Sequence, residues 1–184
     1  MIVRPGLICG PGDTSDRYGY WPARFARDKG PALLPDLGQM STQVIDSRDL
    51  AAWILQGVEN QLTGTLDAVG PNVSWPVLIG AVMETTGYTG RIQLAAPEWL
   101  LDQGVNQWAG PDSLPLWLPE DLFGMMDRSG RAAQAAGLKL RPYDETLAAV
   151  LADEKSRGLD RDRRAGLSVA KEKELLALLE AASS

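Results

Sequence analysis

The apolar run at residues 1–8, MIVRPGLI, limits the possible fold more than any other stretch of this 184-residue chain. Its continuous apolar character is typical of a central strand in a parallel sheet, because a half-exposed strand would alternate apolar and polar side chains. A central strand needs neighbours on both edges and helices on both faces. No β-α unit precedes this one, so we expect the chain to form part of a sheet rather than all of it.

The glycine-rich stretch at residues 4–13, RPGLICGPGD, does not have the spacing of a phosphate-binding turn. A dinucleotide-binding turn needs G-x-G-x-x-G between a strand and a helix, whereas Gly6, Gly10 and Gly12 give G-x-x-x-G-x-G. Pro11 removes an N–H that a phosphate cradle would use. No acidic residue ends a second strand about 20 residues further on, where a ribose contact would require one. We interpret the stretch as the end of a strand.

The rest of the chain alternates predicted strands with predicted helices, which indicates the α/β class. Asp46 or Ser47 should cap a helix whose Leu50, Ile54 and Val58 recur on one face. We expect one unit at residues 1–157 and a charged, solvated linker at 158–167. A C-terminal helix at 168–184 should dock its leucines on that unit.

Charge and composition narrow the possible partners. The net charge of −6 gives little electrostatic support to a nucleic-acid or anionic-membrane partner, so we expect neither. No apolar run approaches the ~20 residues that span a bilayer, and no signal peptide is visible. The one cysteine, Cys9, cannot form an internal disulfide. These features favour a cytoplasmic protein.

The sequence contains no histidine, which excludes Ser–His and Cys–His nucleophile pairs and histidine-ligated metals. We predict no metal site. Any acid–base chemistry must come from Asp, Glu, Tyr, Lys or the thiol of Cys9. Cys9 lies in an apolar setting flanked by glycine, and we expect it to be an inert buried thiol.

Four segments, in order, resemble the C-terminal half of extended short-chain dehydrogenases/reductases, the NAD-dependent epimerase/dehydratase group. They are VRPGLICGPGD, QVIDSRDLAAWILQGVE, GTLDAVGPNVSWPVLIGAVMETTG and RSGRAAQAAGLKLRPYDETLAAVLADEKSRG. The resemblance implies a partial Rossmann-like parallel sheet, made of the C-terminal strands, with a substrate-binding lobe and the C-terminal helix. The glycine fingerprint and the Tyr-x-x-x-Lys pair of the family are absent. The chain therefore looks like a truncated member without its nucleotide-binding part.

The resemblance also implies where a cofactor would lie. Pro5, Gly6, Leu7 and Ile8 would pass beside the nicotinamide of an NAD or NADP that the other half holds, so we expect no tight binding by this chain alone. No catalytic residue is assigned within the chain. Hydride transfer in the complete enzyme makes the class an oxidoreductase, of reductase or epimerase type.

The candidate substrate pocket combines the strand end with aromatic and basic residues. Leu7 occupies a position where many sugar-nucleotide epimerases carry asparagine, which favours a small, fairly apolar carbonyl or hydroxyl substrate. The pocket residues that we assign are Gly10, Tyr20, Trp21, Arg24 and Trp108. Packing in the core is the alternative for each tryptophan. A solvated helix face is the alternative for Arg17, Arg24 and Arg27.

Two other functions stay open. A cofactor-free small-molecule binding or cyclase-like protein would rely on carboxylates, namely Asp13, Asp46, Asp49 or Glu98, although Asp46 and Asp49 also suit helix capping. An interaction module would pair through the exposed edge of the first strand, with a separate N-terminal half-chain or with a second copy as a dimer or other homo-oligomer.

Overall fold

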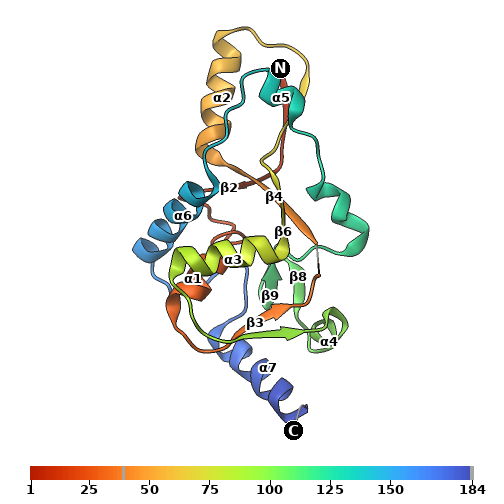
Figure 1. Cartoon of the computed structure of the whole chain (residues 1–184), viewed down its shortest axis with the longest axis vertical. Helices are drawn as coiled ribbons and strands as arrows, with labels where there is room; N and C mark the ends of the chain where they lie inside the picture. Colours follow the sequence, from red (N-terminus) through yellow and green to blue (C-terminus); the bar gives the residue numbers. More distant parts are fainter. Residues whose placement is uncertain (39, 183–184) are drawn as a thin grey trace.

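The computed structural model describes residues 1–38 and 40–182. Strands alternate with helices along the chain, which confirms the predicted α/β class (Figure 1). The elements are β1 (Ile2–Pro5), β2 (Leu7–Cys9), α1 (Tyr20–Arg27), β3 (Ala32–Pro35), β4 (Ser41–Asp46), α2 (Ser47–Glu59), β5 (Thr65–Ala68), β6 (Asn72–Ser74), α3 (Trp75–Thr86), β7 (Ile92–Ala95), α4 (Pro97–Asp102), β8 (Asn106–Trp108), β9 (Ser113–Pro115), the 3₁₀ helix η1 (Glu120–Met126), α5 (Arg131–Ala135), α6 (Tyr143–Arg157) and α7 (Val169–Ala182).

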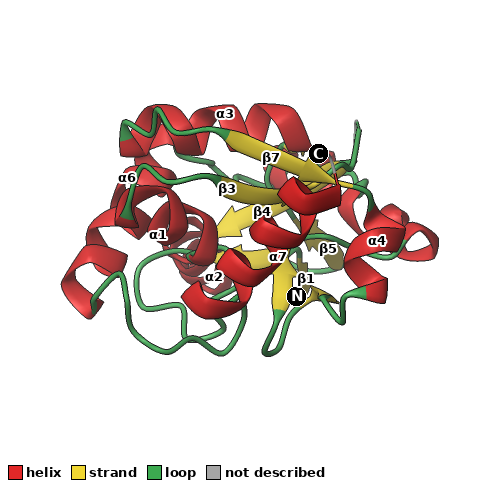
Figure 2. Ribbon diagram, turned by 90° about the horizontal axis from the view of Figure 1, so that it is seen from below, coloured by secondary structure: helices red, strands yellow, loops and turns green. Residues whose placement is uncertain are grey.

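The first predicted strand is divided at Gly6 between two partners. β1 pairs in parallel with β5, with Val3 opposite Leu66, and β2 pairs in parallel with β4, with Ile8 opposite Ile45. β6 extends the second group as an antiparallel neighbour of β4. β3 pairs with β7, and β8 with β9, both in parallel. The described strands form small, mostly parallel sheets, and helices surround them (Figure 2).

β1 is more exposed than its apolar sequence predicts. Within the described part of the chain it pairs with β5 alone, so one edge has no strand partner. Ile2 is 63% exposed, and Arg4 and Pro5 are exposed as well. In β2, Leu7 and Cys9 are buried. The prediction of a buried strand is therefore wrong for β1 and only partly right for β2, where Leu7 and Cys9 are buried but Ile8 is 40% exposed.

The helix α2 begins as predicted but buries a different face. Asp46 is its N-cap and accepts a hydrogen bond from the backbone N–H of Arg48 at 2.9 Å. Leu50 and Trp53 pack into a small core with Ile45, Ala68, Ala133 and Leu138. Ile54 and Val58, predicted to share the face of Leu50, are 36% and 69% exposed, and Leu55 is 65% exposed. We call Ile54, Leu55 and Val58 the α2 stripe.

Buried ion pairs hold the C-terminal segments against the rest of the molecule. Asp16 and Glu154 are both 2% exposed. Three arginines form ion pairs with these two carboxylates, namely Arg157, Arg161 and Arg163. Residues 158–167 are therefore not the solvated connector that their charges predict. The boundaries of the three predicted units stay a prediction.

The helix α7 lies at the end of the molecule opposite α2 (Figure 1). Its Leu175 is fully buried and Leu176 and Leu179 pack against the core, as predicted, whereas Leu178 is 43% exposed. Arg24 is 4% exposed because Glu172 of α7 binds it, so a solvated helix face is wrong for this arginine. Residues 183 and 184 of the predicted terminal helix lie outside the described residues.

Candidate functional site

A cavity of about 310 Å³ lies along the end of β1 and the start of β2. We call it the β1–β2 cavity. It brings together all four residues predicted to lie beside a nicotinamide and one predicted substrate residue, Trp108. Its lining residues are Pro5, Gly6, Leu7, Ile8, Arg17, Trp108, Met125, Met126 and Arg128. Its volume is at the lower end of the range for small-molecule sites, which suits a ring and a small substrate rather than a whole dinucleotide.

Gly6 forms the floor of the cavity where the strand changes partner. Its N–H donates to the carbonyl of Ala68 at 2.9 Å. A Cβ at this position would lie 3.1 Å from Cγ1 of Val69, so a side chain would press on the loop after β5. Glycine therefore allows two backbone segments to approach closely here.

Two guanidinium groups stand at the cavity, and its lining contains no carboxylate. Arg128 donates to the carbonyls of Arg4 and Pro5, both at 3.0 Å, and pairs with Asp67. The Arg128 hydrogen bond holds the pKa of the Asp67 carboxyl below its usual value. Arg17 lies over the ring of Trp108, with Cζ 5.0 Å from the ring centroid. The cavity thus combines apolar side chains with two cations, of which Arg128 is paired with Asp67.

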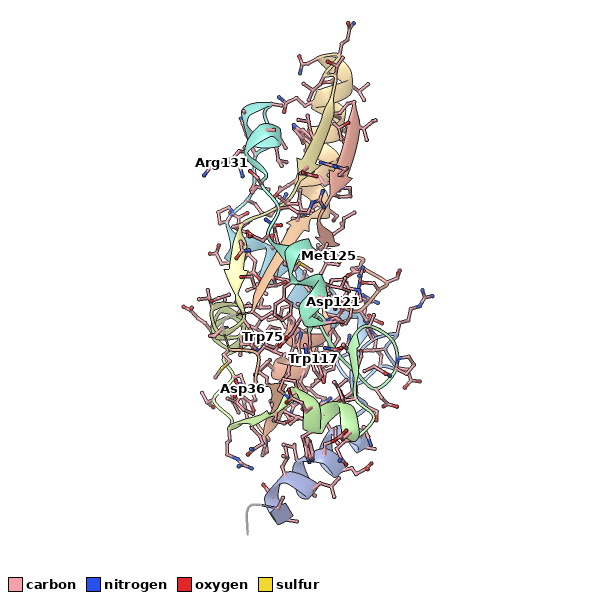
Figure 3. The ribbon with its side chains drawn as sticks, turned by 90° about the vertical axis from the view of Figure 1, so that its right-hand side faces the viewer. Asp36, Trp75, Trp117, Asp121, Met125 and Arg131 are labelled. Atoms are coloured by element: carbon pink, nitrogen blue, oxygen red, sulfur yellow. The ribbon has the colours of Figure 1, made fainter. Side chains whose placement is uncertain are left out.

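No feature of the sequence predicted Met125, Met126 or Arg128 at this site. They come from η1 and the residue pair after it, more than 115 positions from β1, and η1 carries Met125 on the face seen in Figure 3. Side chains of β4 and β6 hold the segment in place: Asn72 Nδ2 donates to the carbonyl of Met126 at 2.6 Å, and Gln43 Nε2 donates to that of Arg128 at 2.9 Å. The spacing of apolar residues in the sequence cannot predict the position of a segment that is held by hydrogen bonds from distant strands.

A second hollow, of about 350 Å³, adjoins the β1–β2 cavity and shares Ile8 and Arg17 with it. Gly10, a predicted substrate residue, lies here with φ of 138°, a backbone conformation that favours glycine. Cys9 is 1% exposed, and burial, followed by the nearby Asp46 and Asp13 charges, strongly raises the pKa of its thiol. The structure confirms that the thiol is buried, and its inertness stays a prediction.

The other predicted substrate residues lie elsewhere. Trp21 is a core side chain whose Nε1 donates to the carbonyl of Pro115 at 2.8 Å. Tyr20 and Arg24 line a different cavity, of about 460 Å³, together with residues 159–163. Burial raises the pKa of the Tyr20 phenol well above its usual value. The structure therefore does not bring these three residues to the β1–β2 cavity, and a substrate role for them stays a prediction.

Three of the four carboxylates considered for cofactor-free catalysis have hydrogen-bond or ion-pair partners. Asp13 accepts from the N–H of Ser15 at 2.8 Å. Asp46 caps α2; burial would raise its pKa, but hydrogen bonds from Arg48 outweigh this and lower it. Asp49 pairs with Arg141 at 2.7 Å. Glu98 lines a further cavity beside α4. The described residues contain no cluster of acidic and cysteine side chains that could hold a metal ion. They also include no helix long and apolar enough to cross a membrane.

Comparison with known proteins identifies the fold. No family model matches the sequence, and no curated protein matches it. Among solved structures, RMD from Pseudomonas aeruginosa complexed with NADPH is 17% identical with a TM-score of 0.59, over 85% of this chain and 48% of that one. UDP-glucose 4-epimerase from Thermus thermophilus in complex with NAD is 15% identical with a TM-score of 0.56, over 85% and 46%. A GDP-L-fucose synthetase from Naegleria fowleri bound to NADP is 10% identical with a TM-score of 0.58, over 84% and 44%.

These structures define the class of fold as a Rossmann-like α/β fold, as predicted. The chain spans less than half the length of each of the three solved chains. The likeness therefore covers one part of a larger fold.

Proposed function

We propose that this chain supplies the substrate side of an NAD(P)-dependent reductase or epimerase of the extended short-chain dehydrogenase/reductase type. Its substrate would be a small, fairly apolar carbonyl or hydroxyl compound. The observation that carries the proposal is the position of the β1–β2 cavity, directly beside a strand whose second edge has no partner in the described residues. Three solved structures with the same partial fold, each about twice as long, were determined with NADPH, NAD or NADP.

The residues of the cavity suit the nicotinamide end of such a cofactor, which when bound would supply or accept a hydride. Pro5 and Gly6 offer a narrow backbone floor, and Arg128 holds that floor through the carbonyls of Arg4 and Pro5. Leu7, Ile8 and Met125 would exclude water from a reacting carbonyl. The chain lacks a glycine fingerprint and a Tyr-x-x-x-Lys pair. Phosphate binding and proton transfer would therefore fall to a second, nucleotide-binding part.

The partner surface of this proposal is the free edge of β1 with the α2 stripe beside it. Unpaired strand edges readily accept another strand, and exposed apolar patches mark association sites. Met1, the residue before β1, lies close to α2, because a Cβ on Gly57 would lie 2.7 Å from Cε of Met1. Gly57 itself is buried and is not part of the α2 stripe. A nucleotide-binding part that adds a parallel strand to β1 would also cover Leu55 and Val58. A second copy of the chain is the competing occupant.

Enzymatic assay tests this proposal. The isolated chain, mixed with NADH or NADPH and small apolar ketones, should not oxidise the nucleotide. The DNA upstream of its coding region should encode a glycine fingerprint and a Tyr-x-x-x-Lys pair, and the polypeptide so encoded should restore oxidation when expressed with the chain. Steady turnover by the isolated chain would overturn the proposal, and so would an upstream region without either motif.

Charged substitutions in the α2 stripe should prevent association with the nucleotide-binding part without unfolding the chain. The double variant Leu55→Glu, Val58→Glu should abolish association with the nucleotide-binding part, because it puts two carboxylates into an apolar contact. It should leave the isolated chain folded, because both side chains are exposed. Val77→Glu, at a 62% exposed position on α3, is the matched control and should still associate. Analytical ultracentrifugation gives the masses; a wild-type homodimer that the double variant dissociates would assign the surface to a second copy instead.

A further inference from the structure

Trp108 has an unusual backbone conformation at the wall of the β1–β2 cavity. Its φ is 69°, and the N–H of Ala109 donates to the carbonyl of Gln107 at 2.8 Å, which makes Trp108 the central residue of a γ-turn. The γ-turn with positive φ is the rare and strained form, and a bulky residue there is an outlier. Strained residues of this kind cluster at ligand sites. Pairing of β8 with β9, which places Trp108 opposite Pro115, holds the turn.

Arg17 is the cation that the indole of Trp108 positions. Contact through the ring face, with Cζ 5.0 Å from the centroid, fixes the guanidinium without using its terminal N–H donors. Its Nε donates to Ser15 Oγ at 3.3 Å. Among the described residues, no carboxylate lies within ion-pair distance of Arg17. By contrast, Arg128 on the other side of the cavity is occupied by Asp67 and two carbonyls.

The rest of the lining is apolar and soft. Ile8 and Met125 are 40% and 51% exposed and provide surface against which a flat ring can pack, and methionine sulfur makes favourable contacts with aromatic rings. Leu7 and Met126 also line the cavity but are 9% and 3% exposed, and the sulfur of Met126 accepts a hydrogen bond from the N–H of Gln43. The cavity therefore presents one guanidinium with free donors, an indole and an apolar floor, with no acidic group in its lining. A planar guanidinium with free N–H groups matches a carboxylate.

We propose that the β1–β2 cavity binds a planar apolar compound that carries one carboxylate, with the carboxylate on Arg17 and the ring against Trp108 and Met125. This inference rests on the proposed function and deepens it: the reactive carbonyl or hydroxyl group of the substrate would lie towards Gly6 and Leu7. Trp108 and Arg17 are specificity residues in this assignment, and the strain at Trp108 is the price of placing its indole under the guanidinium.

The experiment is a titration of the isolated chain with 2-naphthoate, a fluorescent aromatic carboxylate, followed by fluorescence anisotropy. Methyl 2-naphthoate, which lacks the charge, is the matched ligand. Wild-type protein should bind the acid about tenfold more tightly than the ester, as one charge-assisted contact predicts. Arg17→Ala should weaken binding of the acid by about tenfold and leave binding of the ester nearly unchanged. Arg17→Lys should recover part of the loss, because lysine keeps the charge without the planar fork.

Arg131→Ala is the control variant, since Arg131 is exposed on α5 and lies outside the cavity lining (Figure 3). It should bind both ligands like wild type. Trp108→Gly should weaken both ligands while keeping the far-ultraviolet circular dichroism, because glycine adopts positive φ without strain. Equal affinities for acid and ester, or unchanged binding by Arg17→Ala, would overturn the inference. The titration contains no nucleotide and no partner, so its outcome is independent of the assay that tests the proposed function.

Discussion

Glu172→Ala is expected to lower the free energy of unfolding by about 3–5 kcal/mol, the usual effect of removing one member of a buried ion pair. Glu172 is 2% exposed. It accepts hydrogen bonds from Arg24 Nε at 2.7 Å, from Arg27 at 3.0 Å and from the N–H of Leu33 at 3.2 Å. Without it, the guanidinium of Arg24, 4% exposed, would stay buried without its main partner. Urea unfolding followed by tryptophan fluorescence measures the change.

Glu174→Ala is the control on the same helix. Glu174 pairs with Lys171 at 3.2 Å, and its side chain is 59% exposed. Exposed pairs of this kind contribute little, so the control should change stability by no more than about 0.5 kcal/mol. Similar losses in the two variants would show that the pair under α7 is not the contact that docks this helix. If Glu172→Ala does not fold, Glu172→Gln can be measured instead, and it should lower the free energy of unfolding by a smaller amount.

Asp16→Asn should cost about 2–3 kcal/mol, less than the first variant because the arginines around Asp16 keep some contact with water. Asp16 accepts from Arg161 at 3.2 Å and from the N–H of Arg164 at 2.8 Å, and it pairs with Arg157. Its φ is 62°, a conformation that asparagine also tolerates, so the change removes charge without adding backbone strain. Asp160→Asn, at an exposed position of the same segment, should be neutral.

The contribution of Asp16 to stability should depend on pH in a definite direction. Burial would raise the pKa of Asp16, but hydrogen bonds from Arg161 and Arg164 outweigh it and hold the pKa below its usual value. A carboxyl with a lowered pKa stabilises the fold above its unfolded pKa of about 3.9 and loses that contribution as the pH falls through the folded value. Between pH ~5 and pH ~2, wild type should therefore lose more stability than Asp16→Asn. Parallel curves for the two proteins would contradict this role of Asp16.

Local signals in the sequence predicted the start of α2, which Asp46 caps as expected. Such signals act within one turn of the chain, so they can be read without a structure. The choice of the buried face of α2 failed, because Leu50 and Ile54 both carry apolar side chains and only the neighbours decide which is covered.

The candidate site could be predicted only in part. Pro5, Gly6, Leu7 and Ile8 lie next to one another in sequence and share the β1–β2 cavity, together with Trp108. The opposite wall, from Met125 to Arg128, depends on hydrogen bonds to Gln43 and Asn72 from distant strands. Arg24 pairs with Glu172, 148 positions away. Contacts over such separations depend on the tertiary fold, which leaves no mark in the spacing of residues.

The division of the first strand at Gly6 has a mechanical consequence. Within the described residues one edge of β1 has no strand partner, β2 follows after one residue, and both strands line the β1–β2 cavity. A strand that hydrogen-bonds to β1 would therefore act directly on backbone that lines the cavity, through covalent continuity of the chain. Binding of a strand at the edge of β1 and the shape of the cavity are in this way directly coupled, because no helix or loop lies between β1 and β2.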